Sequence, residues 1–392
     1  MIDRLAAALL AAIASLAVIA LSAPPAQAGG RDSAILVLVP QKPAAPPSYS
    51  ESVAAGMASI PELSLGLVSA TQGSYRAEQA LLDISQGARV SRSTYSPSEP
   101  IPVYLRRGPG DSGQVSRWNR VLERAHSAPQ SVEPGLLGGS LPGGTGWVGP
   151  KPVGPPSTVD PVFRPGTLAS DLFELRQLRL IRAATDNGST AIPATDRRGR
   201  IAGIAVTDPG DRAAEALEMA EGMDLTVVVT SPGGPGQGEL RQILRRLEPD
   251  QLLIAMQRPP VGAILPLLPI AAAGLGDEPA GLTSDTSNTE NLVAGIDIAP
   301  TILDHLGIEI PEEMTGSVMR PEGERDPGAL APYRDRLDEL GPRRTPALIL
   351  IAAGWLVFLL VYGAIAGIDR ALLPVRRIGG LAILWIPTVI MI

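Results

Sequence analysis

The sequence predicts an α/β fold in which a mostly parallel sheet is flanked by helices, followed by transmembrane helices. Short apolar runs rich in Val, Ile and Leu are typical of strands buried on both faces. Segments of about ten residues with helical periodicity separate several of these runs, as in βαβ units. Hydrophobic residues make up 45% of the 392 residues, which is enough for one large core.

The first 28 residues have the pattern of an export signal. Arg4 supplies a positive charge, residues 5–21 are apolar, and Ala26 to Ala28 has the small-x-small form of a cleavage site. An uncleaved membrane anchor is the alternative interpretation. We expect cleavage and export of the remaining chain.

The N-terminal part of the exported chain predicts two strands and two helices. Its first apolar run ends at Pro40, and Gly87 follows the second helical pattern as a stop signal. The predicted elements are a strand at 34–39, a helix at 51–58, a strand at 63–68 and a helix at 76–84.

The middle of the chain, about residues 99–165, predicts an insertion without regular structure. Residues 131–160 contain 8 Gly and 6 Pro, which break helices and strands. We therefore expect a long surface loop or a flexible insertion there. Within the insertion, a short helix is predicted at 117–125, because Trp118 and Val121 begin a helical apolar stripe.

Strands and helices alternate again in the next part of the chain. The predicted elements are a strand at 201–206, a helix at 211–221, a strand at 225–229, a helix at 237–247 and a strand at 252–256. We expect both blocks to contribute to the same sheet. The exported residues 29–345 then form one α/β domain.

A charge-free stretch of 23 residues, 346–368, is long enough to cross a bilayer. Arg370, Arg376 and Arg377 follow it, so the positive-inside rule places this end in the cytoplasm and the α/β domain outside the inner membrane. A second apolar run, 378–392, is short for a span. It is either half-inserted or the start of a truncated transmembrane helix, and we expect truncation.

Composition excludes several function classes. The net charge of −7 argues against nucleic acid as a partner, because phosphate binding needs a basic surface. The absence of Cys excludes disulfides, thiolate nucleophiles and Cys-ligated metals, and two His residues cannot build a multi-His centre. The partners that remain are the membrane and either an envelope protein or an anionic ligand.

Residues 295–308, followed by Pro311 and Gly316, carry a family resemblance. The run Asp297-Ile298-Ala299-Pro300-Thr301-Ile302-Leu303, with Gly307 after it, is similar to a segment of the alkaline phosphatase superfamily. The resemblance includes the sulfatase, phosphodiesterase and phosphoglycerate mutase-like branches. It implies an α/β hydrolase fold with one or two metal ions beside a Ser or Thr nucleophile.

The same segment makes sense physically as the start of a helix. Pro300 is tolerated in the first turn, Asp297 can accept bonds from the first amides, and Gly307 can end the helix. The motif therefore has a structural role of its own. Its presence does not require a surviving catalytic centre.

The metal ligands that the resemblance implies are missing from their expected places. The first strand ends in Pro40 and Gln41 where the family has an Asp, and Pro232 stands in the place of a second carboxylate ligand, with Gly233 in that of a His. A Pro side chain has no lone pair for a metal. We expect no metal, no cofactor and no catalytic residue, with at most one site made of Asp alone.

Hydroxyl-rich turns supply the candidate ligand-binding residues. Two of them, Ser69 and Thr71, follow the second strand, where the resemblance places the nucleophile; without a base or metal they are weak nucleophiles. The others are Thr230, Ser231, Thr283, Ser284 and Asp285. The glycine run 233–238 could hold an anion at a helix start, but a flexible loop is the preferred interpretation.

Three functions are compatible with these observations. The leading hypothesis is a membrane-tethered, extracytoplasmic pseudo-hydrolase that serves as a binding or assembly module in the cell envelope. The first alternative is a metal-dependent phosphatase, sulfatase or phosphodiesterase that uses unconventional ligands such as Asp208, Asp285 and Asp297. The second is an accessory ectodomain of a multi-span transporter or polymerase.

Overall fold

The computed structural model describes residues 32–41, 50–69, 77–89, 103–128, 131–151, 187–259 and 267–336, and single helical positions between 349 and 364. The chain divides into two compact units, Met1–Leu330 and Ala331–Ile392. The first unit contains the sheets and the candidate site residues, so it is the unit that matters for function.

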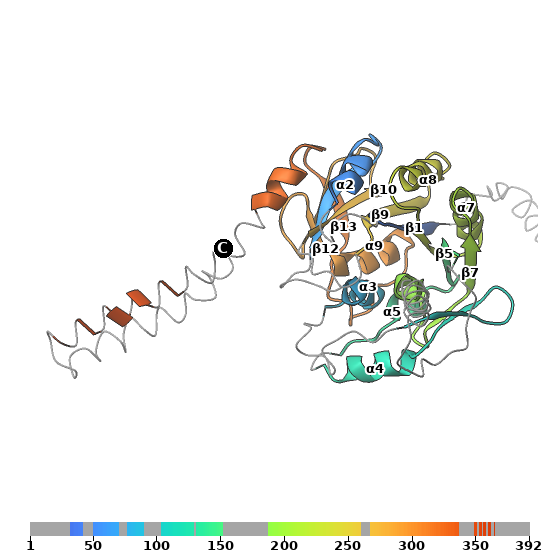
Figure 1. Ribbon diagram of the computed structural model, residues 1–392, viewed down its shortest axis with the longest axis horizontal. Helices are drawn as coiled ribbons and strands as arrows, with labels where there is room; N and C mark the ends of the chain where they lie inside the picture. The colour runs from blue at the N-terminus through green and yellow to red at the C-terminus, as the bar shows by residue number, and fades with distance from the viewer. Residues whose placement is uncertain are drawn as a thin grey trace, which may run out of the picture. The chain divides into compact units, whose positions relative to one another are not determined.

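A ten-stranded mixed sheet forms the centre of the first unit (Figure 1). Its order is β13-β11-β2-β10-β9-β1-β8-β5-β7, with β12 paired to β2. Only β10 and β13 run antiparallel to their neighbours in the described sheet. The strands are β1 Ser33–Val39, β2 Ser64–Ser69, β5 Thr145–Pro150, β7 Gly203–Thr207, β8 Leu225–Val229, β9 Gln251–Gln257, β10 Leu267–Ala273, β11 Gly281–Ser284, β12 Leu292–Ala294 and β13 Met319–Glu322.

Strand β1 lies at the centre of the sheet, between β9 and β8. All seven of its residues are buried, and Leu36 is in register with Val227 on one side and Ile254 on the other. A strand that is covered on both faces needs apolar residues at every position and not at alternate ones. This is the pattern from which the parallel sheet was predicted, and that prediction is confirmed.

Helices cover both faces of the sheet (Figure 1). On one face lie α2 Glu51–Ala58, α7 Arg212–Gly222 and α8 Gly234–Leu244, where α8 contacts both α2 and α7. On the other lie α3 Ala77–Gln86, α5 Leu136–Ser140 and α9 Ile298–His305, where α3 contacts both α5 and α9. Two short 3₁₀ helices are η2 Ile192–Ala194 and η3 Gly295–Asp297, and α4 is Trp118–His126. The α/β class with flanking helices is therefore confirmed.

The middle of the chain differs from its prediction. The expected loop or flexible insertion is wrong for the described residues 131–151, because α5 and β5 lie there and β5 is an inner strand between β8 and β7. Glycine is used here for close packing: a Cβ on Gly146 would lie 2.2 Å from Met219 Sδ, and one on Gly149 2.2 Å from the Trp147 ring. Residues 152–160 lie outside the described residues.

A second, three-stranded antiparallel sheet lies beside the main sheet. Its order is β3-β4-β6, with bounds Leu105–Arg107, Gly113–Val115 and Arg200–Ile201. The predicted strand 201–206 is thus divided between two sheets, because β6 belongs to the small sheet and β7 to the large one. The predicted helix at 117–125 is present as α4.

The predicted signal peptide, 1–28, and the second apolar run, 378–392, lie outside the described residues. The predicted span 346–368 is described only at single positions between 349 and 364, which are helical. Searching the described part of the chain finds no helix with the length and apolar character needed to cross a bilayer.

Candidate functional site

The candidate residues collect along one edge of the main sheet. Strands β11, β2, β12, β9, β1, β8, β5 and β7 all run in the same direction, so their carboxyl ends share this edge. Ligands of open α/β sheets bind at the carboxyl ends of the strands. The described edge holds two polar clusters, one beyond β11 and one beyond β8.

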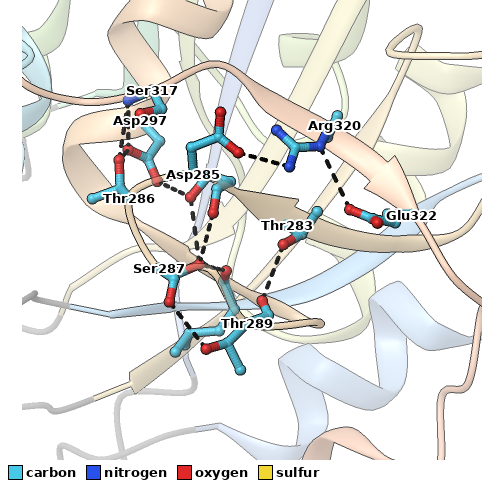
Figure 2. Close-up of polar contacts among 11 residues, drawn as sticks. Thr283, Asp285, Thr286, Ser287, Thr289, Asp297, Ser317, Arg320 and Glu322 are labelled. Carbon is cyan, nitrogen blue, oxygen red and sulfur yellow. Dashed lines mark hydrogen bonds and ion pairs between the residues drawn. The ribbon is translucent and has the colours of Figure 1, made fainter. Parts of the chain in front are cut away.

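The first cluster surrounds the Asp297 carboxylate, which is fully buried (Figure 2). Oδ2 accepts hydrogen bonds from Ser284 Oγ at 2.5 Å and from the Ala294 amide at 2.7 Å. Oδ1 accepts from Thr286 Oγ1 at 2.6 Å and from the Ser317 amide at 3.0 Å. We call these five residues the Asp297 cluster. Its two oxygens have about four acceptor positions, and four donors occupy them.

Asp297 makes no capping bond to α9 itself, because the 3₁₀ turn η3 precedes that helix. The Asp297 carboxylate accepts from the amide of Ala294, the N-cap of η3, so the predicted bond to a first amide is present one turn earlier. The Asp297 carbonyl oxygen instead accepts from Thr301 Oγ1 at 2.6 Å, and Thr301 Oγ1 accepts from the Met319 amide at 2.8 Å. Thr301 therefore links the start of β13 to the start of α9 through hydrogen bonds to Met319 and Asp297.

Close backbone packing explains why the motif has a glycine, Gly316, after the helix. A Cβ at this position would lie 2.2 Å from the Ile296 carbonyl oxygen and 3.0 Å from the Asp297 amide nitrogen, so only glycine permits this approach. The Gly316 amide donates to the Gly87 carbonyl at 3.1 Å. The motif residues thus have a local structural purpose, in agreement with the interpretation as a helix start.

Asp285 is exposed and directed away from Asp297 (Figure 2). Its Oδ1 lies 2.7 Å from Arg320 Nη2, and Arg320 Nε lies 3.5 Å from Glu322 Oε2. The hydrogen bond from Arg320, and then its charge, lower the pKa of Asp285 below its ordinary value. Thr283 Oγ1 donates to the Thr289 carbonyl at 3.1 Å, inside the same turn. The side chains of Thr283 and Asp285 therefore already have hydrogen-bond or ion-pair partners within the protein.

The second cluster lies beyond β8 and joins three buried side chains. Arg212 Nη1 donates to Ser231 Oγ at 2.8 Å, and Ser231 Oγ donates to Glu239 Oε1 at 2.7 Å. The Ser231 amide donates to Glu239 Oε2 at 2.8 Å. Burial lowers the pKa of the Arg212 guanidinium, while the charges of Glu239 and Asp208 act to raise it. We call Arg212, Ser231 and Glu239 the Ser231 cluster.

Sequence reasoning found Ser231 but missed its two charged partners. Arg212 and Glu239 are only 4% and 5% exposed, whereas charged residues are almost never fully buried unless they are paired. The sequence signal for Arg212 was helical spacing, because it lies four residues before Ala216 and eight before Ala220 on the buried face of α7. Thr230, the neighbouring candidate, is 1% exposed, and its Oγ1 has no hydrogen-bond partner among the described residues.

The glycine run 233–238 is helical and not a flexible loop, so that prediction is wrong. Helix α8 begins at Gly234, and Gly233 before it has φ 76° and ψ −143°, a conformation that favours glycine. A Cβ on Gly236 would lie 1.8 Å from the Ser231 carbonyl oxygen. The run therefore lets α8 approach the end of β8 and places Glu239 against Ser231.

Amide groups occupy the centre of the edge, where β1 and β9 end. Gln257 Oε1 accepts from the Ser50 amide at 2.8 Å, and Gln257 Nε2 lies 3.5 Å from Gln41 Oε1. Ser50 Oγ accepts from the Val53 amide at 3.3 Å and caps α2. Pro40 and Gln41 follow β1 as the sequence indicated, so the residues directly after this strand are uncharged.

The structure separates the candidates into distant groups. Ser69 ends β2 and pairs with Ala294, beside the Asp297 cluster, while Thr71 lies outside the described residues. Strands β11 and β8 are five positions apart, which at about 4.8 Å per strand is roughly 24 Å. Asp208 follows β7, two strands further, and pairs with Lys151. Asp208, Asp285 and Asp297 therefore cannot share one metal ion.

The two histidines lie away from both clusters. His305 Nε2 lies 3.1 Å from the Asp250 carbonyl oxygen at the end of α9, and His126 is exposed at the end of α4. Within the described ranges, no group of three or more His, Cys, Asp and Glu residues is placed to hold a metal ion.

Comparisons with known proteins give weak structural likenesses. No family model matches the chain, and no curated protein matches it. Among solved structures, the PH0037 protein from Pyrococcus horikoshii is 11% identical with a TM-score of 0.35, over 73% of this chain and 99% of that one. The structure titled Ps i-CgsB is 10% identical with a TM-score of 0.34, over 75% of each chain. Likenesses this weak carry no functional conclusion.

Proposed function

We propose that this protein is a membrane-tethered domain with an alkaline-phosphatase-like fold that lies outside the cytoplasm. In this proposal it serves as a binding or assembly module of the cell envelope and does not hydrolyse esters. The observation that carries the proposal is the state of Asp297, the acid of the family-like segment. Its carboxylate accepts four hydrogen bonds from the protein itself.

The residues at the ends of β1 and β8 support the same conclusion. The resemblance implies carboxylate and imidazole ligands there, whereas this chain has Pro40 and Gln41 after β1 and Pro232 and Gly233 soon after β8. The carboxylate bonded to Ser231 is that of Glu239, which already accepts hydrogen bonds from the Ser231 amide and hydroxyl. A divalent cation would have to displace these internal donors before it could bind.

The apolar segment 346–368 supports attachment to a membrane. Its charge-free length suits a hydrocarbon layer of about 30 Å. In the unit Ala331–Ile392, the described large apolar side chains are exposed, which would be unfavourable in water. They are Ile349, Leu350, Leu356, Val357, Leu360 and Val361.

Metal analysis and turnover on the same sample test this proposal. The full chain, purified in detergent and exposed to Zn²⁺, Mn²⁺ or Ca²⁺, is desalted, analysed for bound metal and assayed with aryl phosphate and aryl sulfate esters. We expect far less than one ion per chain and no turnover above that of buffer. Stoichiometric metal together with ester hydrolysis, both lost in Asp297→Asn, would overturn the proposal.

A further inference from the structure

A groove with a basic wall lies at the opposite edge of the main sheet. Its volume is about 740 Å³, and it is lined by residues at the amino ends of β5 and β7, by α5 and by the small sheet. Glycine backbone forms much of the wall, at Gly108, Gly138, Gly139 and Gly144, so a ligand can come close to the main chain. Three arginines, Arg197, Arg198 and Arg200, line the same groove.

Two of these arginines form ion pairs within the protein, and the third forms none with a described residue. Arg200 pairs with Asp196 at 2.8 Å, and Arg197 pairs with Glu133 at 2.9 Å. Arg198 is exposed, and its guanidinium forms no ion pair with any described residue. It therefore keeps all its donors for a ligand.

A further arginine faces the same side of the small sheet. Arg106 of β3 is in register with Gln114 of β4, which is in register with Arg200 of β6. Residues opposite each other in register point to the same face of a sheet. Arg106 is exposed and forms no ion pair with a described residue, and it stands two strands, or about 10 Å, from Arg200.

Hydrogen bonds with three side chains fix the backbone of the turn that carries Arg198. Trp118 Nε1 donates to the Arg197 carbonyl at 3.0 Å, and Asp196 Oδ1 accepts from the amides of Arg198 and Arg200 at 2.8 Å. Gln114 Nε2 donates to the Arg198 carbonyl at 3.1 Å. A ligand would not have to order this backbone, which lowers the entropy cost of binding.

The charge of the groove is opposite to that of the chain. Among the described residues, Asp196 and Glu133 are the acids that form ion pairs with this group of arginines, which comprises Arg197, Arg198 and Arg200 in the groove and Arg106 beside them. Asp111 lies in the hairpin between β3 and β4, and the full chain carries −7. Guanidinium groups bind phosphate through two parallel hydrogen bonds. Several arginines spread over a groove and the sheet face beside it fit a ligand with several phosphates better than one with a single phosphate.

We propose that this groove, together with the adjoining face of the small sheet, binds a linear polyanion that carries phosphate groups, with Arg198 in the groove and Arg106 beside it as the principal contacts. The inference names a ligand class for the binding role proposed above but does not rest on it. The groove and the carboxyl edge lie at opposite ends of the strands, so the groove can bind whether or not that edge is catalytic.

A titration with inorganic polyphosphate tests the groove directly. The full chain in neutral detergent is titrated with polyphosphate by calorimetry, beside the double variants R106E/R198E and R245E/R246E. Arg245 and Arg246 follow α8, are exposed, and change the net charge by the same amount. We expect wild type and R245E/R246E to bind within twofold of each other, and R106E/R198E to bind at least tenfold more weakly.

Two outcomes would overturn the proposal. Equal weakening of both double variants, or no binding by wild type, would mean that the groove is not a polyanion site. A second titration uses vesicles of phosphatidylglycerol in place of polyphosphate. Binding to these vesicles without binding to polyphosphate would assign the arginines to a lipid surface and would also overturn it. The assay measures affinity and not turnover, so its result is separate from that of the metal and esterase test.

Discussion

Asp297 shows how a buried acidic residue can have a structural role. It is buried and ionisable, and such a group is stable only if its oxygens are paired. Two hydroxyls, Ser284 and Thr286, and two amides, Ala294 and Ser317, provide that pairing from three different segments of the chain. The carboxylate therefore joins the ends of β11, β12 and α9 to the segment before β13.

Replacing Asp297 by Asn tests this role. The amide group keeps the shape but has one acceptor oxygen, and its NH₂ faces donors, so we expect a loss of about 3 kcal/mol or more in the free energy of unfolding. Urea denaturation measures the change. Asp285→Asn is the matched control in the same loop, where an exposed pair should change stability far less. Equal stabilities of Asp297→Asn and wild type would contradict the role.

The two glycines Gly236 and Gly238 of α8 offer a second matched pair. A Cβ on Gly236 would meet the Ser231 carbonyl oxygen at 1.8 Å, while one on Gly238 meets nothing within 4 Å. We expect Gly236→Ala to destabilise the protein by about 2 kcal/mol or more, and Gly238→Ala to be neutral or stabilising by up to about 1 kcal/mol. Thermal unfolding measures both variants, and equal, small effects of the two substitutions would contradict the close packing of α8 on the end of β8.

At the scale of elements, the apolar pattern predicted several of the buried strands and missed others, among them β5 and β10. Strands β1, β8 and β9 carry continuous Val, Ile and Leu, and their positions were predicted within a residue or two. Strand β5, TGWVGP, has two glycines and a proline, which usually break strands. Its glycines make room for Met219 and for the Trp147 ring, and packing of this kind depends on distant residues.

Amide hydrogen exchange tests the placement of β5. An inner strand between β8 and β7 should exchange its amides as slowly as β1, because opening it requires much of the sheet to open. We expect residues 146–149 to rank with β1, and the edge strand β3 to exchange faster. Exchange of 146–149 within seconds would mean that this segment is a loop, as its composition alone suggests.

At the scale of the molecule, the sequence predicted which turns are polar but not how they are grouped. Ser284 lies in the Asp297 cluster and Ser231 in the Ser231 cluster, because the strand order places four strands between β11 and β8. Single-sequence patterns do not determine that order. The buried Arg212 and Glu239 were missed for the same reason, since their burial depends on how α7 and α8 pack on the sheet.

The acids at the carboxyl edge are held in internal hydrogen bonds, so we expect no divalent cation to bind there. Thermal unfolding of the full chain in detergent, in EDTA and then with excess Zn²⁺, Mn²⁺ or Ca²⁺, measures such binding. A cation at about 100 times its Kd would add roughly 2.7 kcal/mol, or about 5 °C or more in Tm. We expect the same Tm in every condition. A saturable rise in Tm that disappears in Asp297→Asn would contradict this expectation.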